Sequence, residues 1–204
     1  MFKKVAADVL GLSDIGSVIK PADYDKVDAD DYVMHEDDEK IYFLIKSKSD
    51  EYCFTNKAII HLDGTSAMSK KRTLRRYSYA EHNIAGVVLE TAGTVDLDIE
   101  IKFVIGEVPF SIDVHKKYIE ELKDLYKALI KISEVCRENA TSLDYAVQSL
   151  SLASNTLNRS VTQEDRTVEN FKAINEAAFN WLMESRKQYK VKDFGFVFEK
   201  YINN

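Results

Sequence analysis

The chain has 204 residues, of which 45% are hydrophobic and 30% are charged, a composition typical of a globular protein in water. This length predicts one ordinary domain with an appendage, or two small domains. No apolar run approaches the roughly 20 residues of a membrane-spanning helix, and the N-terminal stretch lacks the apolar core of a signal peptide. We therefore expect a cytoplasmic protein.

The net charge of −6 is concentrated at the front of the chain, where residues 1–39 carry 11 acidic side chains and 4 lysines. Such an acidic segment disfavours nucleic acid as a partner, because phosphates need a basic surface. Residues 28–31 (DADD) and 36–40 (EDDEK) resemble loose strings of calcium ligands, but they lack the spacing and central glycine of an EF-hand loop. We expect a solvated acidic arm with short helical turns at 2–11 and 14–19.

From residue 40 the pattern is typical of β-strands. The strongest run is residues 97–105, in which Leu97, Ile99, Ile101 and Phe103 alternate with charged residues, because a period of two indicates a strand with one buried face. We expect this run to pair with residues 85–88 across a reversal at Gly93. Five further runs are predicted as strands of the same antiparallel meander: residues 41–46, 51–55, 58–62, 72–79 and 109–114.

The second half of the chain predicts helices. Apolar residues recur every three or four positions over 115–135, which predicts an amphipathic helix covering an open end of the sheet. Residues 143–157 and 168–189 predict an αα-hairpin. A hairpin alone buries too little apolar surface to be stable, so it must dock on the β domain or pair with another copy.

Two separated motifs resemble the bacterial pleckstrin-homology (PH) domain family: YCFTNK at 52–57 and LETAGTVDLD at 89–98. The resemblance covers roughly residues 10–131 and implies an α+β fold, a PH-like seven-stranded antiparallel β-barrel with a C-terminal capping helix. Residues from about 135 resemble the extension of YvbH-like proteins, which is classed as an oligomerisation region. The expected division is an acidic arm packing on the barrel (1–39), a PH-like domain (40–131) and a helical hairpin extension (132–204).

A basic segment at the start of the fourth predicted strand is the best candidate for a binding patch. Its cations are Lys70, Lys71, Arg72, Arg75 and Arg76. Cations near a membrane surface attract anionic lipids or other anions. On a strand, however, Arg75 and Arg76 point to opposite faces, and the cations can instead neutralise the acidic arm. PH domains that bind phosphoinositides carry a Lys-x-Arg pattern at the first β-turn, and residues 46–50 (KSKSD) match it poorly.

No catalytic or metal-binding constellation is found in the sequence. Cys53 and Cys136 are expected to be buried free thiols rather than a disulfide. The four histidines (His35, His61, His82 and His115) show no metal spacing. Residues 193–195 (DFG) match the magnesium motif of kinases by letters only, because the glycine-rich loop and HRD stretch are missing. We expect no enzyme activity, no metal and no cofactor.

The sequence therefore predicts a non-enzymatic, homo-oligomeric assembly or binding module. The aromatic residues offered for the oligomer interface are Trp181, Phe194, Phe196 and Phe198, because exposed aromatic clusters mark interaction surfaces. Two other functions remain open. One is a membrane-surface or anion-binding adaptor that uses residues 70–76, and the other is a peptide-recognition domain that takes an extended peptide at a sheet edge.

Overall fold

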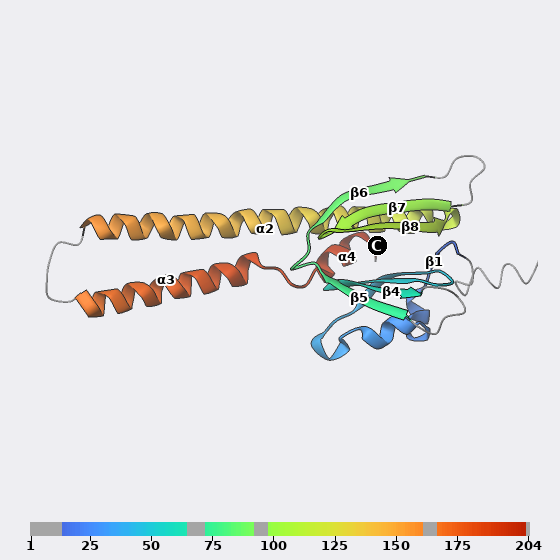
Figure 1. The fold of residues 1–204 in the computed structure, drawn as a ribbon, viewed down its shortest axis with the longest axis horizontal. Helices are drawn as coiled ribbons and strands as arrows, with labels where there is room; N and C mark the ends of the chain where they lie inside the picture. The colour runs from blue at the N-terminus through green and yellow to red at the C-terminus, as the bar shows by residue number, and fades with distance from the viewer. Residues whose placement is uncertain (1–13, 65–71, 92–97, 161–166, 203–204) are drawn as a thin grey trace, which may run out of the picture. The chain divides into compact units, whose positions relative to one another are not determined.

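The computed structural model describes residues 14–64, 72–91, 98–160 and 167–202 (Figure 1). The chain divides into two compact units, residues 1–134 with 192–204, and residues 135–191. We call the first the β unit and the second the helical unit. The chain leaves the β unit at residue 134 and returns to it at residue 192, so the helical unit is an insertion that is tied to the β unit at both ends.

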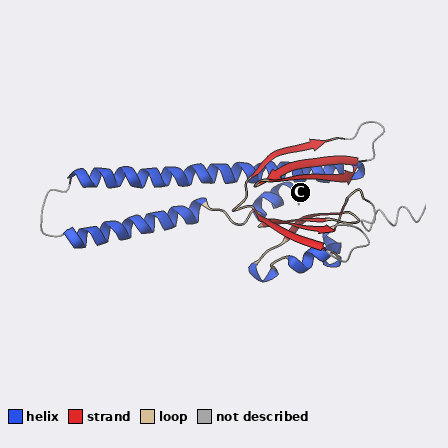
Figure 2. Cartoon of the chain, in the orientation of Figure 1, coloured by secondary structure: helices blue, strands red, loops and turns tan. Residues whose placement is uncertain are grey.

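The β unit contains two antiparallel sheets (Figure 2). The five-stranded sheet has the order β1-β2-β3-β4-β5, with β1 Ser17–Val18, β2 Ile41–Lys46, β3 Glu51–Thr55, β4 Ala58–Gly64 and β5 Arg72–Ser78. The three-stranded sheet has the order β6-β7-β8, with β6 Ile84–Glu90, β7 Asp98–Ile105 and β8 Val108–His115. All seven predicted strands form, and the predicted pair is confirmed, because β6 runs antiparallel to β7 with Leu89 opposite Ile101. The reversal expected at Gly93 lies outside the described residues.

The short strand β1 was not predicted from the sequence. Its residues lie where a helical turn was expected, at 14–19, so that prediction is wrong. The turn is replaced by a connection between the two sheets. The backbone N–H of Gly16 donates to the carbonyl of Asp113 at 2.8 Å, and His115 N–H donates to the Gly16 carbonyl at 3.0 Å. A side chain at residue 16 would lie 2.9 Å from the Asp113 carbonyl oxygen, so this close approach requires glycine.

Aromatic rings fill the space between the two sheets. Phe103 of β7 stacks on Phe110 of β8 with ring centroids 5.0 Å apart. From the other sheet, Phe54 meets the edge of Phe103 at 6.3 Å, and Tyr77 meets Phe110 at 5.4 Å. The alternation predicted for β7 is confirmed, because every second residue from Ile99 to Ile105 is buried. These contacts form the core of the PH-like fold.

The acidic arm packs on the opposite face of the five-stranded sheet. Its described part folds into three short 3-10 helices, η1 (Pro21–Lys26), η2 (Asp28–Tyr32) and η3 (His35–Asp37). Their apolar residues Val27, Ala29 and Val33 are buried in one cluster with residues of β2, β3 and β4. These three apolar side chains of the arm are therefore part of the core, whereas Tyr32 and Met34 remain about half exposed.

The predicted helices form, but their boundaries differ. One continuous helix, α2 (Ile119–Ser160), replaces the separate helices expected at 115–135 and 143–157. The prediction of a break was wrong because it rested on a change of composition, whereas the span holds no glycine or proline to end a helix. A short turn, η4 (Lys116–Tyr118), precedes α2, and α3 (Thr167–Tyr189) and α4 (Gly195–Tyr201) follow it. A fully buried stripe joins the first turns of α2 to the β unit: Leu122, Leu125, Ala128, Leu129 and Ile132.

Candidate functional site

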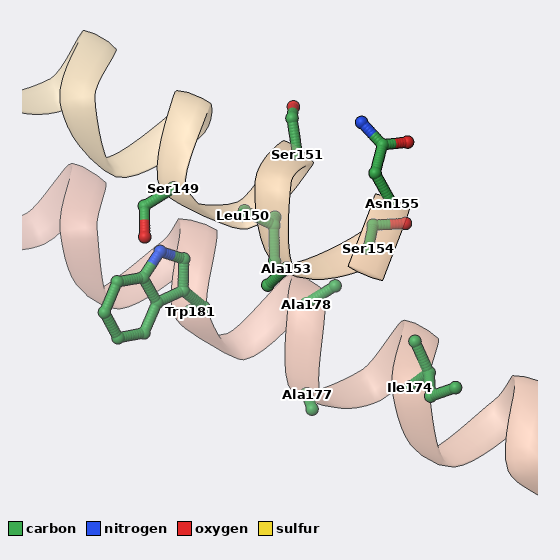
Figure 3. A pocket seen from close by; sticks show the side chains of 10 residues that line it. All are labelled: Ser149, Leu150, Ser151, Ala153, Ser154, Asn155, Ile174, Ala177, Ala178 and Trp181. Atoms are coloured by element: carbon green, nitrogen blue, oxygen red, sulfur yellow. The ribbon is translucent and has the colours of Figure 1, made fainter. Parts of the chain in front are cut away.

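The helical unit is a hairpin made by the second half of α2 and by α3, with very little buried surface. Among its described side chains only Ala146 and Ser185 are buried. The facing sides of the two helices are formed mainly by small residues, and a hollow of about 730 Å³ lies between them (Figure 3). Residues that line it include Ser149, Ala153, Ala177 and Ala178. Small side chains allow close approach of helices but supply little apolar area of their own.

Trp181 links the two helices of the hairpin. Its indole N–H donates to the backbone carbonyl of Ala146 at 3.3 Å, and its ring lies beside Ser149 of α2 (Figure 3). The side chain is nevertheless 49% exposed. Trp181 thus holds the two helices together and also presents part of its ring to solvent.

Large apolar side chains elsewhere on the hairpin are exposed. On α3, Phe171 is 69% exposed and Phe179 is 60% exposed. On α2, Leu152 is 68% exposed and Tyr145 is 64% exposed. Further exposed apolar side chains are Val147, Ile174, Leu182 and Met183. Large exposed apolar areas of this kind mark sites of association.

The aromatic residues predicted for the oligomer interface fall into two groups. Phe194 and Phe198 are fully buried inside the β unit, where both rings contact Tyr79. Trp181 belongs to the helical unit, and Phe196 on α4 is 54% exposed. The oligomer interface remains a prediction. Of the four aromatic residues proposed for it, Trp181 and Phe196 have ring surface exposed to solvent.

Backbone and side-chain hydrogen bonds hold the C-terminal segment in place. The N–H of Phe194 donates to the Asn56 carbonyl at 2.7 Å, and the amide of Asn56 donates to the Asp193 carboxylate at 2.6 Å. Figure 1 shows α4 between the two sheets. The C-terminal segment that carries Phe194, Phe196 and Phe198 therefore belongs to its own β unit.

The basic segment is only partly described, because Lys70 and Lys71 lie outside the described residues. Its three arginines lie on β5, and each makes an ion pair within the β unit. Arg72 reaches Asp28 of the arm at 2.5 Å, and Arg75 reaches Asp63 at 2.8 Å. Arg76 makes a bidentate pair with Glu39, at 2.9 and 3.0 Å. Two of these contacts are those expected if the cations neutralise the acidic arm.

Two buried carboxylates, one at the end of the arm and one in β3, were not predicted from the sequence. Glu39 and Glu51 are each about 1% exposed. Glu51 accepts the backbone N–H of Ala29 at 2.8 Å and pairs with Lys46. The burial of Glu51 could have been predicted from the alternation of β3, because residues 51 and 53 lie on the same face of the strand and Cys53 is buried.

Opposing influences act on the protonation of Glu39. Burial raises the pKa of its carboxyl group, but hydrogen bonds from Arg76, from Thr55 and from the Met34 backbone, together with the Arg76 charge, lower it more. The net result is a pKa below the ordinary value. Glu39 is therefore a carboxylate that fastens the arm to β3 and β5.

The described residues hold no group of three or more His, Cys, Asp or Glu side chains that could bind a metal ion. Cys53 and Cys136 are not joined in a disulfide. Burial raises the pKa of both thiols, which disfavours the reactive thiolate. Within the described part of the chain, no helix has the length and apolar character needed to cross a membrane.

Comparisons with known proteins agree with this architecture. The model of the bacterial PH domain matches residues 9–147, and the model of the YvbH-like oligomerisation region matches residues 144–204. The chain is 60% identical to the "Uncharacterized protein YvbH" of Bacillus subtilis (strain 168) over the full length of both.

A crystal structure of a PH-domain-containing protein from Exiguobacterium sibiricum 255-15 is similar with a TM-score of 0.86 and 52% identity, covering 93% of this chain and 100% of that one. Two antiparallel sheets, the helix that follows them and the hairpin thus recur together in a relative. The chain belongs to the bacterial PH domain family and carries a YvbH-like oligomerisation region at its C-terminal end.

Proposed function

We propose that this protein is a non-enzymatic assembly module whose helical hairpin associates with the hairpins of other copies of the same chain. The observation that carries this proposal is the exposed apolar surface of the hairpin, in particular Phe171 and Phe179 on α3. Burying one large apolar side chain is worth about 1.5–3 kcal/mol. Several such side chains provide a large driving force for association.

The charge of the hairpin supports a second copy as the partner. Residues 135–189 hold 6 basic and 7 acidic side chains, whereas the whole chain has a net charge of −6. Like-charge repulsion between two hairpins is therefore weak. The match of this region to a family of oligomerisation regions supports the same partner.

The test is the mass of the full chain in solution, measured by light scattering with and without substitutions on the exposed face of α3. We expect a defined oligomer for the natural sequence. Phe171→Glu combined with Phe179→Glu should dissociate it, because both carboxylates would be placed in the buried interface. Neither side chain is buried within the hairpin, so the fold of one chain should be retained.

The matched control is Ala173→Glu combined with Asn180→Glu, which adds the same two charges at exposed positions on another face of α3. This variant should keep the mass of the natural protein. A monomeric natural protein, or equal masses for both double variants, would refute the proposal.

A membrane-surface adaptor that uses residues 70–76 has weaker support. The guanidinium groups of Arg72 and Arg76 are already paired with acids of residues 14–51, so an anionic lipid would have to compete with them. Binding to vesicles of anionic lipid that falls with added salt would favour this adaptor over the assembly module.

A further inference from the structure

The β unit has an open edge at strand β6. Among the described residues β6 pairs only with β7, and it ends the order β6-β7-β8. Its pairing with β7 is interrupted between Ala85 and Val88. Gly86 in that interruption has a φ of 59°, and a side chain there would meet nothing within 4 Å. Space is therefore open beside Gly86, and among the described residues no further strand pairs with β6.

Helix α2 lies beside this edge and leaves a groove. At one end the hydroxyl of Ser133 donates to the Ile84 carbonyl at 2.6 Å, which fixes α2 against the start of β6. Farther along β6 a hollow of about 500 Å³ separates the strand from the helix. The residues that line it are Val87, Val88, Leu89, Lys123, Tyr126 and Lys127.

The apolar residues of the groove remain partly uncovered. Leu89 lies opposite the fully buried Ile101, yet Leu89 itself is only half-buried. Val88 on the other face of the strand is 45% exposed. A short apolar strip beside unpaired strand edges is the type of surface to which an extended peptide adds as a further strand.

The charge of the groove favours an acidic peptide. Lys123 and Lys127 both line it, and none of the described residues that line it is acidic. Each lysine pairs with an acid of its own helix, Glu120 or Asp124, in an exposed ion pair. Exposed pairs of this kind are weak, and each ammonium group has three donors. Both lysines are therefore able to bind an incoming carboxylate.

The spacing of the two lysines matches an extended chain. Four residues along a helix rise by about 6 Å, and alternate residues of a strand are separated by about 6.6 Å. We propose that the groove between β6 and α2 binds an extended acidic peptide, which adds to β6 as a strand and places carboxylates two residues apart against Lys123 and Lys127. This site is independent of the hairpin and of the assembly proposed for it.

The experiment uses the full chain and a fluorescein-labelled octapeptide of alternating valine and glutamate, with binding followed by fluorescence anisotropy. We expect saturable binding by this probe and none by the same peptide with lysine in place of glutamate. Lys123→Glu combined with Lys127→Glu should weaken binding about tenfold or more, the effect of losing ~1.4 kcal/mol. Both side chains are exposed, so the fold should be unaffected.

The matched control is Lys20→Glu combined with Lys26→Glu. These lysines are also exposed, and Lys26 makes the same kind of pair, with Asp23. This variant should bind the probe as the natural protein does. Equal loss of binding in both double variants would show that only the net charge of the protein matters, and it would overturn the proposal.

Two further measurements test strand addition itself. Methylation of the peptide nitrogens at one set of alternate residues should abolish binding, whereas methylation at the other set should not, because only alternate N–H groups face β6. If the affinity is unchanged by methylation of either set of nitrogens, the peptide does not add to β6 as a strand. If the Lys123 and Lys127 variant instead changes the mass of the protein in solution, the occupant of the groove is a second copy, and the peptide proposal fails.

Discussion

Tyr42 and Phe198 stack with their ring centroids 5.3 Å apart and their planes at 18°, although most of the chain lies between them. Tyr42 belongs to β2, and Phe198 belongs to α4 at the other side of the hairpin insertion. The Tyr42 hydroxyl also donates to Glu199 at 2.9 Å. This contact makes the last helix of the chain part of the β unit.

Replacing Phe198 by alanine should destabilise the β unit. Phe198 is fully buried, and truncating a buried phenylalanine typically costs about 3–5 kcal/mol. Urea unfolding followed by the near-ultraviolet circular dichroism of the tyrosines measures this loss. The single tryptophan, Trp181, lies in the helical unit, so its fluorescence reports the hairpin separately.

The control for this change is Phe196→Ala on the same helix. Phe196 is 54% exposed, and substitutions of exposed side chains usually change stability by less than about 0.5 kcal/mol. If the two variants unfold at the same urea concentration, α4 does not contribute to the stability of the β unit.

Arg76→Ala should be far more destabilising than Arg75→Ala, although the two residues are neighbours. Arg76 neutralises Glu39, whose side chain is fully buried. Removing one partner of a buried pair typically costs about 3–5 kcal/mol, because the other charge stays buried without compensation. Arg75 pairs with Asp63 at the surface, where a pair is worth about 0–1 kcal/mol.

Urea midpoints of the two arginine variants at neutral pH measure the difference. Replacing both Arg76 and Glu39 by methionine should recover much of the loss, since an apolar pair removes the need to bury a charge. Equal midpoints for Arg75→Ala and Arg76→Ala would show that the ion pair with Glu39 does not hold the arm.

The pH dependence of stability should contain a contribution from Glu39. The pKa of this carboxyl is lower in the folded protein than its ordinary value of 4.5. A lowered folded pKa gives stability that is complete above the unfolded pKa and is lost as the pH falls through the folded pKa. The advantage of the natural protein over Glu39→Gln should therefore be constant from pH 7 to about pH 5 and shrink below that.

Urea unfolding of both proteins at several pH values down to acid conditions measures that advantage. Glu36→Gln is the control, because it removes one carboxylate from an exposed position on the same arm. An advantage for Glu39 that stays constant through the acid range would contradict the lowered pKa.

Local patterns in the sequence predicted the β unit well, because alternation marks a strand whenever one face is buried. The run from Ile99 to Ile105 shows this alternation, and it is buried as predicted. Ion pairing of the arginines with the acidic arm was only one of two interpretations of the basic segment, beside anion binding. Alternation along a strand places Arg75 and Arg76 on opposite faces, but it does not identify their partners. Glu39 lies 37 residues from Arg76, and the packing of the arm alone brings them together.

The C-terminal segment shows where sequence patterns failed. On a helix Phe198 shares a face with Phe194, and Phe196 lies on the other side. An exposed partner surface and a buried docking helix both require an apolar face of this kind, so the spacing did not show which face is buried in the β unit. The difference between Phe196 and Phe198 arises from the contacts of α4 with Tyr42 and Tyr79. The edge groove at β6 also depends on how α2 approaches the strand, and no local pattern encodes that approach.

Removing the hairpin should leave a folded β unit only if α4 is kept. A truncation that ends at Lys131 also removes Ile132, Phe194, Val197 and Phe198, all of which are buried in the β unit. Replacing residues 136–190 by a flexible linker of about ten Gly and Ser residues, with an average span of roughly 17 Å, keeps these side chains. We expect the linked variant to be a folded monomer. We expect the truncation to be unstable and prone to aggregation, because the burial of these four apolar side chains is lost.

Circular dichroism, thermal unfolding and light scattering of both variants measure this difference. A linked variant that keeps the mass of the full chain would show that the β unit assembles without the hairpin. A truncation at Lys131 that is as stable as the linked variant would show that α4 is dispensable for the β unit. The outcome expected here is instead a β unit that needs both ends of the chain, because Asn56 holds Asp193 and Phe194 while Tyr42 holds Phe198 and Glu199.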